Sequence, residues 1–212
     1  MARPREFDET AVLDAAVQCF WTRGYEATSV RDLAEGMGIT GASLYNAFGD
    51  KRTLYRRALN HYLDQTVRER IARLESSMPP RDAIAAFLDE VIERSLSDRQ
   101  RRGCMLVNSA LELAPHDADF RRVVADELAH IEAFFRRCVQ AAQQAGAITA
   151  TQNAEDLARL LLSVLLGIRV LARTRPQRAL LEGVARPVLS MLGPPASAVR
   201  PGKSPAKPSI RP

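Results

Sequence analysis

The stretch TSVRDLAEGMGITGASLYNAF, residues 28–48, decides the fold of the N-terminal part of the chain. Within it, Val30, Leu33, Ala34 and Met37 are spaced i, i+3, i+4, i+7, which places one apolar stripe along a short helix. A buried strand would instead show a run or an alternation of β-branched residues, which is absent from this stretch. The first half of the stretch is therefore predicted to be a helix.

Three glycines in this stretch, Gly36, Gly38 and Gly41, form a G-x-G-x-x-G pattern. A dinucleotide-binding turn with this pattern follows a strand, so that the backbone reaches the pyrophosphate from a sheet edge. Here a helix comes first, so we interpret the glycines as helix boundaries. Gly36 or Gly38 ends one helix and Thr40 caps the next. No nucleotide cofactor is expected.

Local capping signals place the neighbouring helices. Ser29 with Asp32 makes an [ST]-x-x-[DE] start for the short helix, and Asp50 can cap a longer one after residue 50. Before them, residues 8–23 carry a helical apolar stripe that ends at Gly24. Helix, short helix, turn and short helix is the order of a helix-turn-helix, whose last helix enters the DNA major groove.

The rest of the chain also follows the helical period, and no alternating strand pattern appears. The fold class is therefore all-α, with about nine helices. Beyond the long fourth helix and a break at residues 76–82, the patterns predict helices over residues 82–96, 103–114, 117–145, 154–174 and 177–191.

Composition narrows the class of protein. Hydrophobic residues make up 46% and charged residues 26%, which is ordinary for a soluble domain. The net charge of +5 comes mostly from four basic residues in the Pro-rich segment 194–212, which is predicted to be disordered. The net charge of the whole chain is therefore poor evidence for DNA binding. No signal peptide or membrane span is expected, since the apolar run 160–171 is short and contains Arg169. We expect a cytoplasmic protein.

Enzymatic and metal sites find no support. The chain lacks G-x-S-x-G, H-E-x-x-H and P-loop motifs, so it is not expected to be an enzyme. Its three cysteines and three histidines share no ligand spacing, which disfavours disulfides, zinc and other metals.

Residues 15–59, AAVQCFWTRGYEATSVRDLAEGMGITGASLYNAFGDKRTLYRRAL, resemble the N-terminal signature of TetR-family transcriptional regulators. The matching positions are Phe20, Gly24, Tyr25, Thr28, Ser29, Val30, Leu33, Ala34, Gly38, Ile39, Leu44, Tyr45, Phe48, Lys51 and Leu54. The resemblance implies a helix-turn-helix domain over residues 1–52 and a helical ligand-binding and dimerisation domain over residues 53–193, before the tail of residues 194–212.

Five candidate residues suit the DNA backbone. Thr28 and Ser29 stand at a helix start, where hydroxyls and free N–H groups can bind one phosphate. Lys51 begins the fourth helix and suits a phosphate across the groove. Arg3 and Arg5 form an arm that can follow the backbone or the minor groove.

The recognition helix is predicted to expose Thr40, Ser43 and Tyr45, and Asn46 can bond an adenine edge if it faces the groove. The sequence departs from the family at Gly41, where Lys or Arg is common.

Dimerisation is predicted from the run Leu157–Leu171, which is apolar nearly all round. With residues 179–192 it would form a four-helix interface between two subunits, with Gly167 allowing close approach and Leu165 at the contact. The alternative is a core helix buried within a monomer.

The candidate sensor is a polar line on an apolar helix, formed by Cys104, Asn108 and Glu112 at i, i+4, i+8. This stretch also resembles a TetR subgroup in which some members respond to electrophiles through a cysteine. Arg101 and Arg102 would lower the pKa of Cys104 if its sulfur faces them. The alternative is that Cys104 is a small buried hydrophobe and that backbone groups or arginines satisfy the other two.

These features predict a sequence-specific DNA-binding transcriptional regulator. We expect a homodimeric repressor on a palindromic operator in double-stranded DNA, released by an unidentified small-molecule inducer, an electrophile or an oxidant. The alternative from another class is an all-helical adaptor or scaffold that binds no DNA.

Overall fold

The computed structural model describes residues 8–148 and 150–193, and these residues are helical almost throughout. They form ten α-helices and one π-helical turn, or nine helices when the continuous run α4–η1–α5 is counted once. The all-α prediction is confirmed. Within the described ranges, no helix is long and apolar enough to cross a membrane.

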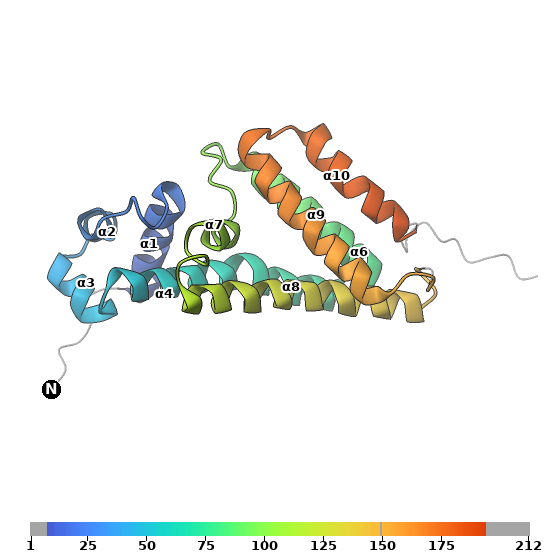
Figure 1. The fold of residues 1–212 in the computed structure, drawn as a ribbon, viewed down its shortest axis with the longest axis horizontal. Helices are drawn as coiled ribbons and strands as arrows, with labels where there is room; N and C mark the ends of the chain where they lie inside the picture. The colour runs from blue at the N-terminus through green and yellow to red at the C-terminus, as the bar shows by residue number, and fades with distance from the viewer. Residues whose placement is uncertain (1–7, 149, 194–212) are drawn as a thin grey trace, which may run out of the picture.

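The first three helices form a small head at one end of the molecule (Figure 1). They are α1 (Glu9–Arg23), α2 (Val30–Gly36) and α3 (Gly41–Phe48). The side chains of Asp8, Ser29 and Thr40 cap the three N-termini, and Ser29 forms a reciprocal capping box with Asp32. Each cap satisfies backbone N–H groups that the first helical turn leaves unpaired. The predicted helix starts at Ser29 and Thr40 are confirmed.

A long helix leads from the head into the body. It runs through α4 (Lys51–Leu63), the π turn η1 (Asp64–Arg68) and α5 (Glu69–Ser77), and Asp50 caps its start as predicted. The π turn was not predicted, because an inserted residue leaves the local apolar pattern helical. The whole helix from α4 to α5 runs alongside α8 (Ala118–Gln144), and the two form one long layer of the body (Figure 1).

Three helices complete the body on the other side of that layer (Figure 1): α6 (Pro80–Ser97), α9 (Ala154–Thr174) and α10 (Arg178–Met191). The short α7 (Met105–Glu112) lies between the head and this group. It is shorter than the predicted helix over residues 103–114, because Gly103 adopts a positive φ of 77° and Cys104 is extended.

Aromatic packing joins the head to the body. Phe20 of α1 meets Tyr55 of α4 edge to face, with ring centroids 4.8 Å apart, and Tyr55 meets Phe120 of α8 at 5.5 Å. The Tyr55 hydroxyl also hydrogen-bonds the Ser109 hydroxyl of α7 at 2.8 Å. The head, α7 and α8 therefore meet around one buried tyrosine. A shift of α7 would change the packing of this tyrosine against the head.

Candidate nucleic-acid interface and sensor site

Helix α3 turns one face to solvent and the other into the head. Leu44 and Phe48 are buried, whereas Asn46 is exposed and Tyr45 has an exposed fraction of 52%. A tyrosine that exposed on a short helix is available for contact with another molecule. No residue of α3 is charged, so any reading by this helix uses neutral groups.

The hydroxyls of Thr40 and Ser43 are engaged with each other at the start of α3. Thr40 Oγ1 accepts the Ser43 N–H at 3.1 Å, and the two hydroxyl oxygens lie 2.9 Å apart. Both lie on the exposed side of the head. The pair fixes the first turn of α3 and so the direction in which Tyr45 projects.

The start of α2 differs from the expectation for Thr28. Its side chain is fully buried and its hydroxyl donates to the carbonyl of Gly24 at 2.5 Å, so it does not reach a phosphate. The reason is that the α1–α2 turn leaves the Gly24 carbonyl without a helical partner, and Thr28 satisfies it. The candidate phosphate-binding side chain Thr28 is therefore corrected to a structural role.

Ser29, by contrast, stays exposed at the same helix start. Its hydroxyl and its N–H both bond Asp32, at 2.6 and 2.9 Å. These bonds, with a further contribution from Arg23, lower the pKa of Asp32 to about 2. The carboxylate is thus charged at neutral pH and lies at the first turn of α2, in the capping box that the sequence predicted.

Lys51 lies against the α1–α2 turn. Its Nζ stands 4.3 Å above the ring of Tyr25 and 3.4 Å from the carbonyl oxygen of Glu26. The cation–π contact holds the ammonium group between the turn and the start of α4. This position places a cation at the start of α4, beside the turn that leads into α2.

Other cations of the head divide into two groups. Three arginines form ion pairs with carboxylates: Arg23 with Asp32, Arg52 with Asp117 and Arg57 with Glu9. Arg31 of α2 and Arg56 of α4 are exposed, and neither forms an ion pair within the part of the chain that the structure describes. Sequence reasoning missed this pair, since pairing depends on distant acids. The predicted arm residues Arg3 and Arg5 lie outside the described residues.

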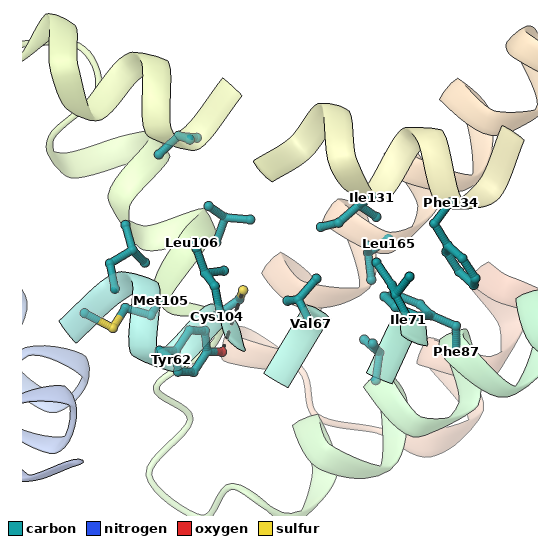
Figure 2. Close-up of a cluster of buried hydrophobic side chains, with 14 of the residues drawn as sticks. Tyr62, Val67, Ile71, Phe87, Cys104, Met105, Leu106, Ile131, Phe134 and Leu165 are labelled. Atoms are coloured by element: carbon teal, nitrogen blue, oxygen red, sulfur yellow. Dashed lines mark hydrogen bonds between the residues drawn. The ribbon is translucent and has the colours of Figure 1, made fainter. Parts of the chain in front are cut away.

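The three candidate sensor residues do not share one site. Cys104 is buried, and its sulfur accepts a hydrogen bond from the Tyr62 hydroxyl at 3.9 Å (Figure 2). Asn108 donates to the Arg102 carbonyl at 3.0 Å and accepts from Arg173 at 3.0 Å.

Glu112, the third candidate, accepts the backbone N–H of Glu26 at 2.9 Å. Its carboxylate also lies beside Gly24, where an added Cβ would come within 3.2 Å of it. Glu112 and Asn108 are thus satisfied by backbone and arginine groups, and α7 is tied to the α1–α2 turn of the head.

Of the two cations expected beside Cys104, Arg102 is bound to other groups. Arg102 bonds Asp98 at 3.1 Å and Gln18 at 2.6 Å, and its guanidinium lies 3.9 Å from the ring centroid of Trp21. Trp21 in turn donates to the Gly103 carbonyl at 3.2 Å. These contacts hold the loop before α7 against α1 of the head.

Cys104 lines a small cavity in the body core, between α5, α6, α7, α8 and α9 (Figure 2). Its walls are mostly apolar and include Val67, Phe87, Leu106, Ile131 and Leu165. The free volume of about 20 Å³ holds one water molecule at most. Two buried arginines, Arg70 and Arg169, complete the wall.

The position of Leu165 corrects the expected dimer contact. Leu165 is 5% exposed and faces the protein's own core, so it is unavailable to a second subunit. The outward face of α9 instead carries Leu160 and Val170, 39% and 48% exposed, and Gly167, around which an added Cβ would meet nothing within 4 Å. On α10 the exposed apolar side chain is Met191.

The other two cysteines have unreactive surroundings. Burial raises the pKa of Cys138 to about 12. Burial likewise raises the pKa of Cys19, although Arg23 acts in the opposite direction. Across residues 8–148 and 150–193, no group of three or more potential metal ligands was found.

Two family models match the chain. Residues 12–58 match the bacterial regulatory proteins of the tetR family, and residues 80–188 match the tetracyclin repressor-like C-terminal domain. The HTH-type transcriptional repressor ComR of Escherichia coli is 30% identical over 174 residues, covering 81% of this chain and 82% of ComR. An uncharacterised HTH-type regulator of Bacillus subtilis, YezE, is 33% identical over 145 residues, covering 68% and 75%.

Solved structures agree with these matches. A cysteine mutant of the TetR-family regulator CifR, complexed with 26-bp operator DNA, has a TM-score of 0.79 and 37% identity over 89% of this chain and 98% of CifR. Reduced Escherichia coli NemR has the same TM-score at 20% identity, over 89% of this chain and 100% of NemR, which shows a shared fold.

Proposed function

Because the chain belongs to the TetR family of DNA-binding transcriptional regulators, we propose that it is a repressor that holds a palindromic operator as a homodimer and leaves it when an inducer enters the body. The observation that carries this proposal is the geometry of α3, which buries Leu44 and Phe48 and presents Tyr45 and Asn46 to solvent. A helix of this kind at the tip of a small head enters a major groove.

Base and backbone contacts are assigned by residue type. Asn46 reads an adenine edge, while Tyr45, Thr40 and Ser43 contact phosphate or sugar at the groove edge. At the helix starts, the N–H groups of α2 beside Ser29 face phosphate.

Cations supply the remaining affinity. Lys51 neutralises one phosphate in each half-site, and Arg31, which is exposed and adjoins Ser29, supplies a second contact. Arg3 and Arg5 extend this contact as the N-terminal arm.

The homodimer forms through the outward faces of α9 and α10. Exposed Leu160, Val170 and Met191 lie on these faces, and Gly167 and Gly183 leave room for close helix approach. A twofold interface of this kind sets the spacing of the two heads to the spacing of the half-sites.

Release follows from the cavity and its links to the head. An inducer that enlarges the cavity displaces α7 and its preceding loop, which Trp21 and Glu112 tie to the head. A covalent adduct on Cys104 acts in the same way, because its bulk has no room in the closed cavity. The relatives are regulators, and we expect no catalytic activity from this chain.

The test is fluorescence anisotropy with labelled duplex from upstream of the protein's own gene, against a shuffled duplex of equal length. We expect tighter binding to the upstream duplex and its loss in Tyr45→Ala, while Met78→Ala, an exposed residue at the far end of α5, serves as the control. Equal affinity for both duplexes across salt concentrations contradicts operator binding and favours a non-DNA adaptor.

A further inference from the structure

Arg169 is a buried cation for which the described part of the chain offers no counter-charge. It lies on α9 in the wall of the cavity beside Cys104 and is 6% exposed. Among residues 8–148 and 150–193, its hydrogen-bond partner is the Ser95 hydroxyl of α6, 3.2 Å from Nη1. No carboxylate among the described residues lies within ion-pair distance of its guanidinium. Buried charges are ordinarily paired, so this one calls for an explanation.

Arg70, the other arginine of the cavity wall, has an acidic partner in Glu90. Glu90 bonds Arg70 at 3.0 Å and also bonds Arg73. Burial lowers the pKa of Arg70, and the positive charge of Arg169 acts in the same direction.

On the head side, a small hollow adjoins the cavity and shares Arg169 with it. This hollow is also lined by Trp21, Arg94, Ser95 and Asp98. The Asp98 carboxylate is held by Arg102 at 3.1 Å, and Arg94 forms no ion pair with any described acid. Cations therefore outnumber free acids where the cavity meets the hollow.

The other part of the cavity is apolar. Phe87, Leu106, Ile131 and Leu165 come from four different helices and close around it (Figure 2). A molecule that satisfies both parts has an apolar body and one acidic group. The apolar body replaces core contacts, and the acidic group pairs with the Arg169 guanidinium, for which the described residues supply only the Ser95 hydroxyl.

We propose that the inducer is a small amphipathic carboxylate whose acid group pairs with Arg169 and Ser95 and whose apolar body occupies the cavity beside Cys104. This inference rests on the proposed release by an inducer and names its chemical class. A free volume of about 20 Å³ means that the described state is closed. The carboxylate therefore binds an expanded state more tightly than the closed one. This difference in affinity shifts the population towards the expanded state, in which α7 is displaced.

The probes are octanoate, its neutral amide and octylamine, which share one chain and differ in charge. Trp21 is the only tryptophan of the chain and adjoins the Arg169 hollow, so its fluorescence reports binding directly. We expect octanoate to bind at least tenfold more tightly than the amide or the amine. Losing a charge-assisted pair lowers affinity by about ten- to hundredfold, so Arg169→Met should abolish that preference.

Arg175→Met is the matched control, since Arg175 is exposed at the end of the same helix. It should retain the preference for octanoate. Cys104→Ser should also retain it, which separates carboxylate binding from thiol chemistry. Thermal unfolding gives a further readout: Arg169→Met should melt at the wild-type temperature or above it, because it removes an unpaired buried charge.

Three results would overturn the inference: no binding of octanoate, equal binding of the amide, or an unchanged preference in Arg169→Met. A lower melting temperature for Arg169→Met together with an unchanged preference would assign Arg169 a structural role. DNA anisotropy of the ligand-free protein is measured in parallel. If the operator is bound and octanoate is not, the inference fails while the proposed repressor function stands.

Discussion

Replacing Gly167 with arginine should separate the proposed dimer without unfolding either subunit. Gly167 lies on the outward face of α9, and a side chain there meets nothing within 4 Å in the single subunit. Glycine in a helix interior is unfavourable by about 0.8 kcal/mol relative to arginine. The substitution should therefore raise the free energy of unfolding of the isolated subunit slightly.

The dimer should respond in the opposite direction. A twofold interface places the substitution in it twice, so two arginines lose water on association. With roughly 3 kcal/mol for each unpaired buried charge, the loss is about 6 kcal/mol. That corresponds to about four orders of magnitude in the dimer dissociation constant.

Sedimentation equilibrium and thermal unfolding together measure both effects. Leu165→Arg is the comparison, since Leu165 lies two positions away and is 5% exposed in the core. We expect Gly167→Arg to be a folded monomer that fails to hold a full operator, and Leu165→Arg to be unfolded. A Gly167→Arg protein that remains a dimer would refute the assignment of this face.

Three further expectations follow from the head, the sensor and their link. Lys51→Ala should flatten the slope of log K for DNA binding against log salt by roughly 1.8, because one phosphate contact is lost in each half-site. An unchanged slope would show that Lys51 does not contact phosphate. Cys104→Ser should bind DNA and should not be released from it by electrophiles or peroxide. Cys138→Ser should still be released, because burial raises the pKa of Cys138 to about 12 and leaves that thiol unreactive. Release of Cys104→Ser from DNA by these agents would contradict a thiol switch. Glu112→Ala should speed hydrogen exchange of the Glu26 amide about tenfold, since that N–H loses its acceptor, and unchanged exchange would show another protecting partner.

Features that depend on near neighbours in the chain could be predicted from the sequence. Ser29, Thr40 and Asp50 cap the helices where the sequence placed the starts, because a cap needs only groups within three residues. The helical period likewise predicted the all-α class. The π turn at Asp64–Arg68 was missed, because its extra residue does not interrupt the apolar spacing.

Features that depend on distant partners could not be predicted. Thr28 has the right chemistry for phosphate, yet folding turns it inward to Gly24. Glu112 finds its partner 86 residues earlier, at Glu26. Leu165 lies on a helix that is apolar on both faces, so the pattern does not tell the core side from the outer side. Arg169 is informative for the same reason, since only the packed body shows that no acid of the described residues forms an ion pair with it.

The uncharged surface of α3 has a consequence for how the regulator behaves when a cell changes its internal salt. Every cation assigned to the interface, Lys51 and Arg31 among them, meets phosphate, which is the same in every DNA sequence. Rising ionic strength weakens those contacts on the operator and elsewhere to the same degree. The discrimination supplied by Asn46 comes from a neutral side chain and stays nearly constant. Under osmotic stress such a protein dissociates from its operator and does not gain affinity for other DNA sites. The expected effect is therefore leaky expression of its target gene and not repression of other genes.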